Sequence, residues 1–196
     1  LETVGERPAN GAVAVRRRPW VLAPDGTPAK ALTGLDDHSR YCVSARLMPR
    51  ERTQLVCDGF QLALTTYGVP EQVLTDNGKV FTGKYSLPPV EVLFDRICRE
   101  NGVEHLLTKP RMPTTTGKIE RFHRTMRLEF DTTQVFNNLR TAQQALDEWV
   151  AYYNAERPHQ ALGYRTPAEV YHAAPASGPP RGAAATPQSS EERSAG

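Results

Sequence analysis

Residues 67–78 decide the fold class and read Tyr67-Gly68-Val69-Pro70-Glu71-Gln72-Val73-Leu74-Thr75-Asp76-Asn77-Gly78. Upstream, apolar residues recur every three to four positions from about Glu51 to Tyr67, which predicts a helix, with Gly68 as the glycine that follows its end. Inside the stretch, Gln72 to Thr75 predicts a short buried strand, and the Asp-Asn-Gly sequence after it favours a turn. A helix that leads directly into a buried strand is typical of an α/β domain.

The same pattern continues on both sides of this stretch. Upstream, Asp25-Gly26 predicts a hairpin turn, followed by strands at Lys30–Leu35 and Tyr41–Leu47, and Ala12 to Val15 could begin a further strand. Downstream, the expected elements are a helix at Glu91–Glu100, a strand at Val103–Leu107, a long helix ending near Phe130, and helices at Arg140–Tyr153 and Ala168–His172. This order predicts a mixed sheet with helices on both faces.

Composition limits the possible classes of protein. The 196 residues carry a formal net charge of +2, which permits nucleic-acid binding without arguing for it. The three cysteines, Cys42, Cys57 and Cys98, show no paired spacing, so we expect reduced thiols in a cytoplasmic protein and no zinc site. No apolar run approaches the length of a membrane span, so no membrane association is expected.

The chain divides by composition into three segments. Residues 1–19 are rich in Ala, Arg, Gly and Pro, have no confident periodicity, and are interpreted as a degenerate or frameshifted N-terminal segment. Residues 20–172 form the expected folded α/β domain. Residues 173–196 are rich in Ala, Pro, Gly and Ser, and are expected to form a disordered tail because they cannot bury enough apolar surface to fold.

Two acids are candidates for chemistry, and each has a simpler interpretation. Asp76 follows a buried strand at the edge of the predicted sheet, where ligand or metal sites are common, but it could equally cap its own turn. Glu120 lies near the start of a predicted helix, with Arg124 and Arg127 on the same side. Glu120 could bind a divalent cation while the arginines bind DNA phosphates, or it could only form a surface ion pair with Arg124.

Four ordered blocks of sequence carry a family resemblance. Leu74-Thr75-Asp76-Asn77-Gly78 and Thr116-Gly117-Lys118-Ile119-Glu120-Arg121-Phe122-His123-Arg124 resemble the second and third signature blocks of DDE-type insertion-sequence transposases, the relatives of retroviral integrases. Leu35-Asp36-Asp37-His38-Ser39-Arg40 resembles the strand-turn block upstream of them. Tyr153-Asn154, Arg157-Pro158-His159, Leu162-Gly163 and Thr166-Pro167 resemble the family's end motif. The resemblance runs from about Trp20 to Tyr171.

The resemblance implies a ribonuclease-H-like fold, with a mixed five-stranded sheet, and a two-metal site for Mg²⁺ or Mn²⁺. Asp76 and Glu120 would be the second and third metal-binding acids, and the reaction would be nicking and joining of DNA at transposon ends. Two divalent ions can activate the attacking oxygen and stabilise the leaving oxygen at phosphorus, without a covalent protein nucleophile. Expected partners are transposon and target DNA and further copies of the chain, in the cytoplasm at the nucleoid.

The chain departs from the family pattern at the first acid. Counted back across Asp25-Gly26, that acid should lie near residues 14–17, which read Ala14-Val15-Arg16-Arg17. Pairing centred on the same turn would bring Asp36 near residue 16, so Asp36 could replace the missing acid, or it could be an ordinary turn residue. We therefore expect reduced activity. The alternative is a catalytically inactive remnant that binds DNA or a transposase partner.

The predicted helix around Glu120 also carries a basic strip, which could bind DNA or be a solvated helix face. Its members are Lys118, Arg121, Arg124 and Arg127. The resemblance favours phosphate contacts, most of all for Arg124 and Arg127, whereas His123 is expected to be a satisfied, half-buried histidine. Asp76 and Glu120 are 44 positions apart, more than is usual in the wider family, and the loop Lys84–Pro89 could hold the surplus.

Overall fold

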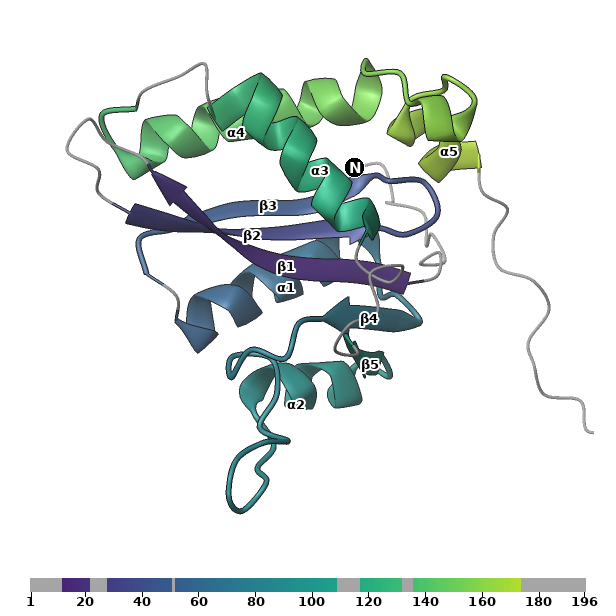
Figure 1. Cartoon of the computed structure of the whole chain (residues 1–196). Helices are drawn as coiled ribbons and strands as arrows, with labels where there is room; N and C mark the ends of the chain where they lie inside the picture. The colour runs from purple at the N-terminus through teal and green to yellow at the C-terminus, as the bar shows by residue number, and fades with distance from the viewer. Residues whose placement is uncertain (1–11, 22–27, 51, 109–116, 132–135, 174–196) are drawn as a thin grey trace, which may run out of the picture.

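The computed structural model describes residues 12–21, 28–50, 52–108, 117–131 and 136–173 (Figure 1). Its strands form one sheet in the order β3-β2-β1-β4-β5. β2 is antiparallel to both β1 and β3, whereas β4 is parallel to both β1 and β5. The strands are β1 (Ala12–Val21), β2 (Pro28–Asp36), β3 (Cys42–Met48), β4 (Gln72–Thr75) and β5 (Glu104–Leu107).

Helices cover both faces of this mixed sheet, so the predicted α/β architecture is confirmed (Figure 1). One face carries α1 (Thr53–Tyr67) and α2 (Leu93–Glu100). The other carries α3 (Gly117–Met126), which continues into a π-helical turn (Arg127–Asp131), and α4 (Leu139–Ala155). The short helix α5 (Pro167–Ala173) follows α4.

Each face of the sheet is sealed by its own apolar core. On the α3/α4 face, Phe122, Phe130, Trp149 and Tyr153 pack against the odd-numbered residues of β2, such as Ala31. On the α1/α2 face the packed side chains include Val15, Val73, Phe60, Phe81 and Phe94. A fully buried large apolar side chain contributes about 1.5–3 kcal/mol. The sheet, including β1, therefore lies between two apolar cores, and Val15 of β1 packs into the one on the α1/α2 face.

β1 is the element that the sequence predicts least well. The strand runs from Ala12 to Val21, through Arg16-Arg17-Arg18-Pro19, although that run has no alternation of apolar and polar residues. Pairing with β2 holds this segment extended despite its local pattern, and β4 pairs with the first four residues of β1, Ala12 to Val15. The division at residue 19 stays a prediction, although β1 crosses it. Residues 1–11 and the tail beyond residue 173 lie outside the described residues.

The predicted register of the first hairpin is wrong by three positions. Asp36 is opposite Val13, and Thr33 takes the place opposite Arg16. The pair formed by Val21 and Pro28 shows that the hairpin is not centred on Asp25-Gly26, which displaces every pair along the strands. Asp36 therefore does not lie beside residue 16.

The loop Lys84–Pro89, where the surplus between the two candidate acids was expected, is exposed and lies between β4 and α2 (Figure 1). A bridge between Gly83 and Val90 closes its base. Position 83 requires glycine, because an added Cβ would lie 2.1 Å from the Val90 carbonyl oxygen. In the described parts of the chain, no helix is both long enough and apolar enough to cross a membrane.

Candidate functional site

The register of β1 defines the centre of the candidate site. β1 and β4 run parallel with Val15 opposite Thr75, so the next residues along, Arg16 and Asp76, lie at the same level where β4 ends. On the other side of β1, Thr33 of β2 is opposite Arg16. Position 16, where an arginine stands, is therefore flanked by the strand that presents Asp76 and by Thr33.

Asp76 occupies a tight turn directly after β4. Its Oδ1 accepts a hydrogen bond from the backbone N–H of Gly78 at 2.8 Å, and the side chain is half-buried. The Asn77 side chain donates to the carbonyl oxygen of Thr108 at 3.0 Å, which ties the turn to the end of β5. The turn role predicted for Asp76 is present. It does not exclude cation binding, because a carboxylate has lone pairs on two oxygens.

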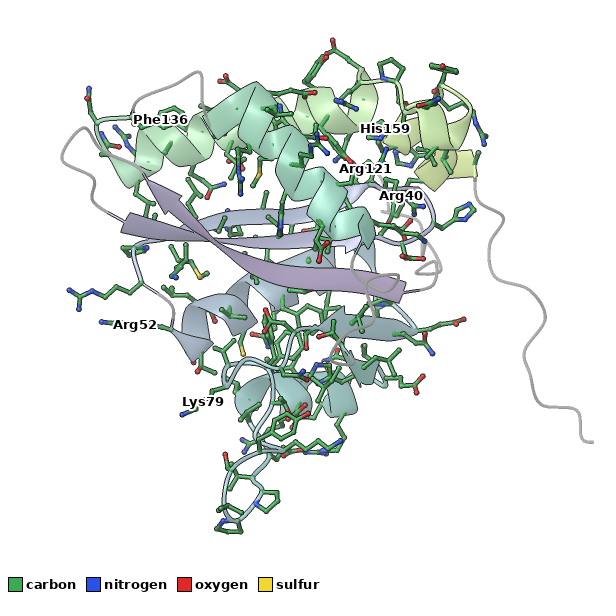
Figure 2. The ribbon with its side chains drawn as sticks, in the orientation of Figure 1. Arg40, Arg52, Lys79, Arg121, Phe136 and His159 are labelled. Carbon is green, nitrogen blue, oxygen red and sulfur yellow. The ribbon has the colours of Figure 1, made fainter. Side chains whose placement is uncertain are left out.

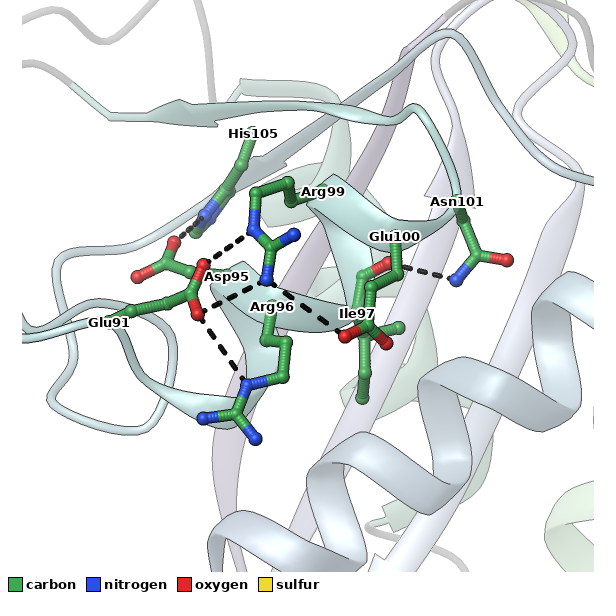
Figure 3. A network of polar contacts seen from close by, with 8 residues as sticks. All are labelled: Glu91, Asp95, Arg96, Ile97, Arg99, Glu100, Asn101 and His105. Atoms are coloured by element: carbon green, nitrogen blue, oxygen red, sulfur yellow. Dashed lines mark hydrogen bonds and ion pairs between the residues drawn. The ribbon is translucent and has the colours of Figure 1, made fainter.

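Three side chains in successive contact, Thr75, His105 and Asp95, connect the end of β4 to β5 and α2. Thr75, just before Asp76, is fully buried, and its Oγ1 lies 2.7 Å from Nε2 of His105 on β5. Nδ1 of the same ring lies 2.6 Å from Oδ1 of Asp95 on α2 (Figure 3). The sequence analysis missed these three residues, because they lie on three elements and form no motif.

Glu120 lies on the helix that covers β1 on one face of the sheet. It is exposed on α3, which packs against β1. Three residues later, about 4.5 Å along the helix axis, Nε2 of His123 lies 2.7 Å from Oγ1 of the buried Thr33. The expectation of a satisfied, half-buried His123 is confirmed. Since Thr33 is opposite Arg16, this contact brings the first turns of α3 to the same level of the sheet as Asp76.

Only two of the four residues of the basic strip, Arg124 and Arg127, line the same surface hollow as Glu120. Glu120, Arg124 and Arg127 line a single hollow of about 480 Å³, together with His123 and Leu128. Arg121 is exposed on α3 but does not line this hollow (Figure 2). Lys118 is held by the β2–β3 turn, where its Nζ lies 2.5 Å from the Asp37 carboxylate and 3.1 Å from the Asp37 carbonyl oxygen. A hollow of about 550 Å³ between α1, β3 and α4 contains neither candidate acid.

Asp36, the residue considered as a replacement acid, is a capped turn residue. Its side chain is buried, and Oδ1 accepts hydrogen bonds from the Ser39 backbone N–H at 2.7 Å and the Ser39 hydroxyl at 2.5 Å. Its own N–H donates to the Tyr41 carbonyl oxygen at 2.9 Å. This geometry, together with the register that places Asp36 opposite Val13, supports the turn-residue interpretation.

Asp76 and Glu120 are the two candidate cation ligands of the site. Among the described residues, no group of three or more His, Cys, Asp or Glu side chains is arranged to hold a metal ion. Asp76 and Glu120 are nevertheless hard oxygen donors on separate elements, and Mg²⁺ commonly binds to one or two carboxylates with other ligands from phosphate and water. By the chemistry of their donors, the two acids suit such an ion.

The end motif serves the scaffold. Asn154 on α4 accepts a hydrogen bond from the Cys42 N–H at 2.8 Å and donates to the Cys42 carbonyl oxygen at 3.1 Å, so it occupies the outer edge of β3. Arg157 forms an ion pair with Glu129 at 2.8 Å, joining the end of α4 to the π-helical turn after α3. Thr166 and Glu169 exchange hydrogen bonds as a capping box at the start of α5.

His159, also in the end motif, has a perturbed pKa. Its ring packs edge-on against Tyr153, with the ring centroids 4.8 Å apart, and its buried Nε2 has no hydrogen-bond partner among the described residues. Burial, the largest cause, and the positive charges of Arg157 and Arg40 together lower the pKa of His159 to about 4, against the opposing effect of Glu129. Arg40 and His159 lie on the same side of the molecule (Figure 2).

Solved structures of viral integrases share this architecture. The simian T-cell lymphotropic virus intasome, solved in complex with PP2A regulatory subunit B56 gamma, contains a chain that matches 94% of this one with a TM-score of 0.70 and 17% identity, over 62% of its own length. The HTLV-2 integrase catalytic core domain, solved in complex with magnesium, matches 84% of this chain with a TM-score of 0.58 and 15% identity, over 98% of its length. The fold is therefore of the ribonuclease-H-like class.

Sequence comparisons identify the family. Two models described as "Integrase core domain" match residues 20–113 and 101–167. An uncharacterized 39.2 kDa protein of insertion element IS476 from Xanthomonas euvesicatoria is 31% identical over 140 residues, which are 71% of this chain and 38% of that protein. A 31.7 kDa protein of insertion element IS407 from Burkholderia multivorans is 30% identical over 145 residues, 74% of this chain and 50% of that protein.

This chain belongs to the integrase core domain family, as a DDE-type transposase/integrase catalytic core. It spans half or less of the length of these two curated relatives. The prediction made from the four sequence blocks is confirmed.

Proposed function

We propose that this chain acts on DNA in transposition or integration, as the core that carries metal-dependent phosphoryl transfer, and that its chemistry is impaired. The observation that carries the proposal is the register of β1, which sets Arg16 at the level of Asp76 and opposite Thr33, next to the helix of Glu120. Position 16, where the family resemblance predicts the first of three acids, is an arginine, on the strand next to the elements that carry Asp76 and Glu120.

Asp76 and Glu120 would hold a divalent cation, Mg²⁺ or Mn²⁺, between the end of β4 and α3. When bound, such an ion lowers the barrier to displacement at phosphorus by stabilising the attacking and leaving oxygens. Arg124 and Arg127 line the same hollow as Glu120. Because one guanidinium group can donate hydrogen bonds to two oxygens of a phosphate, these two arginines would orient the DNA backbone beside the acid.

Of the other basic candidates, Arg121 would add a phosphate contact outside the hollow. Lys118 would contribute less, because its ammonium already contacts Asp37. The HTLV-2 integrase catalytic core was solved in a dimeric form. By analogy we infer self-association for this chain, with transposon and target DNA as its other partners.

Arg16 is the expected cause of impairment. An arginine adds a fixed positive charge at the level of Asp76, where the family resemblance predicts a third carboxylate. Like charges repel, so a cation should bind the remaining two acids weakly. A catalytically silent remnant that still binds DNA through Arg124 and Arg127 is therefore the second candidate, and the same observation at position 16 favours it.

The test is the Arg16→Asp substitution, with Arg17→Asp as a control for the same change in charge. We expect Arg16→Asp to tighten Mn²⁺ binding at least tenfold, by analogy with the loss seen when groups supporting a metal site are removed. It should also create Mn²⁺-dependent nicking of supercoiled plasmid. Nicking by the unmodified chain at a comparable rate would contradict the impairment. Mn²⁺ affinity that is unaffected by Arg16→Asp, Asp76→Asn and Glu120→Gln would refute the metal site.

A further inference from the structure

Two buried threonines flank position 16 and make the same contact. Thr33, on β2, is opposite Arg16, and Thr75, on β4, is opposite Val15. Both side chains are 0% exposed, and each Oγ1 lies 2.7 Å from Nε2 of a histidine, His123 for Thr33 and His105 for Thr75. The two contacts, which we call the Thr–His bridges, lie on either side of β1, and each is close in sequence to one candidate acid.

The Thr75 bridge fixes the strand end that presents Asp76. Nδ1 of the His105 ring contacts the Asp95 carboxylate, and Nε2 of the same ring contacts the Thr75 hydroxyl. The same hydroxyl lies 3.1 Å from the Asp76 carbonyl oxygen. Asp95 of α2 contacts the His105 ring (Figure 3), and this ring contacts the hydroxyl that reaches the Asp76 backbone.

The Thr33 bridge fixes the helix that presents Glu120. Glu120 and His123 are three positions apart, so they are neighbours on one surface of α3. The contact of His123 with Thr33 therefore constrains both the position of Glu120 along the sheet and the rotation of α3 about its axis. Thr33 and His123 are 90 positions apart in sequence. This bond therefore joins the helical layer to the strand beside position 16, and an error in helix rotation would carry the carboxylate away from Asp76.

Thr75, His105 and Asp95 have the order of a nucleophile, base and orienting acid, but the bridge cannot act as one. A nucleophilic hydroxyl must reach its substrate, and Thr75 is 0% exposed beneath the sheet surface. His105 is also mostly covered, with 9% of its side chain exposed. The arrangement suits a fixed support and not covalent chemistry.

We propose that the two Thr–His bridges are positioning devices that hold Asp76 and Glu120 at the separation a divalent cation requires. Thr33, His123, Thr75 and His105 are positioning residues, which act on the cation only through the two acids. The inference rests on the proposed function, since it assumes that these acids share an ion. Groups that support metal ligands from behind often change affinity for the ion by on the order of 10- to 100-fold.

The experiment measures Mn²⁺ binding to the unmodified chain and its variants by electron paramagnetic resonance of the free ion, beside the melting temperature. Thr75→Val and Thr33→Val remove each hydroxyl at nearly constant volume. Each should weaken Mn²⁺ binding on the order of tenfold. Thr75→Ser and Thr33→Ser, which keep the hydroxyl, should bind within about twofold of the unmodified chain, by the same reasoning. Combining Thr75→Val with His105→Phe should weaken binding no further than Thr75→Val does.

Thr82 supplies the matched control. It is a buried threonine, 6% exposed, whose Oγ1 accepts from the Lys84 N–H at 3.2 Å. Thr82→Val should lower the melting temperature and leave Mn²⁺ affinity unchanged. If the bridge variants behave like Thr82→Val, the bridges are structural only and the inference is overturned. If Asp76→Asn and Glu120→Gln also bind Mn²⁺ like the unmodified chain, the proposed function fails as well.

Discussion

The end motif from Tyr153 to Thr166 and the two blocks around Asp76 and Glu120 carry the same family resemblance, yet they differ in structure. Polar side chains of the end motif contact the scaffold: Asn154 is buried against the backbone of β3, and Arg157 forms a partly exposed ion pair with Glu129. The acid blocks lie nearer the surface. Glu120 is exposed, and Asp76 is half-buried in a turn. A shared motif therefore combines residues that build the fold with residues that face a substrate.

This difference has a measurable form, because scaffold residues control the free energy of unfolding and site residues control ligand affinity. Substitution at Asn154 or Asp36 should change stability and leave Mn²⁺ affinity intact. Substitution at Asp76 should do the reverse.

Asn154→Ala should have the largest effect. Asn154 is 5% exposed, and its loss leaves both the N–H and the carbonyl oxygen of Cys42 without their side-chain partner at the edge of β3. Unsatisfied buried groups cost about 1–3 kcal/mol each, so we expect a loss of about 3 kcal/mol. Urea unfolding measures it.

The control for Asn154 is Gln143→Ala, at the other end of the same edge. Gln143 accepts from the Leu47 N–H at 2.7 Å and donates to the Ala45 carbonyl oxygen at 2.9 Å, but it is only half-buried. Water can replace part of these bonds, so the loss should be about 1 kcal/mol. Equal losses in the two variants would show that burial of Asn154 does not set its importance.

Asp36→Ala should have the next largest effect, a loss of about 2 kcal/mol, because the buried Ser39 N–H and hydroxyl lose their shared acceptor. Chemical unfolding, with Mn²⁺ titration of the folded variant, separates the two roles considered for this residue. A turn residue leaves Mn²⁺ affinity unchanged. A replacement acid would lower affinity when removed, which would contradict the structural interpretation.

Local pattern predicts part of this molecule and pairing supplies the rest. The strand Gln72–Thr75 is found with its predicted bounds, and the helix predicted to end at Tyr67 does so, with Gly68 at φ 89°. These elements have local signals, an apolar run or a helical period with a stop residue. β1 has none through Arg16-Arg17-Arg18, and pairing alone makes it a strand.

The candidate site divides in the same way. Asp76 and Glu120 stand out in sequence because each lies in a recognisable block. The supporting bonds could not be predicted, since Thr33 and His123 are 90 positions apart and Thr75 and His105 are 30 apart. Only the three-dimensional fold brings such pairs together. The hairpin register that placed Asp36 beside residue 16 failed because a turn signal does not fix which residues of two strands pair.

His159 gives a smaller, pH-dependent effect on the scaffold side. Its folded-state pKa, about 4, is below the ordinary value of 6.5, so the unfolded chain binds a proton first as the pH falls. Stability is unaffected above pH 6.5 and declines between there and pH 4. The His159 contribution at pH 5 should be a loss of about 1 kcal/mol relative to pH 7, after allowance for its partial exposure. His159→Gln should flatten this part of the curve of unfolding free energy against pH, and an unchanged curve would assign the decline to other groups.

Asp76→Asn should have the smallest effect on stability and the sharpest effect on binding. Asparagine keeps a side-chain oxygen that can accept from the Gly78 N–H, so the turn should survive and the free energy of unfolding should change by less than about 0.5 kcal/mol. The variant loses the negative charge that a divalent cation requires, so Mn²⁺ binding should fall below detection. Asp58→Asn, on the exposed surface of α1, is the matched control and should alter neither quantity. If Asp76→Asn destabilises the fold as much as Asp36→Ala does, the contrast between scaffold residues and site residues does not hold at this strand end. The carboxylate charge of Asp76 would then itself stabilise the turn.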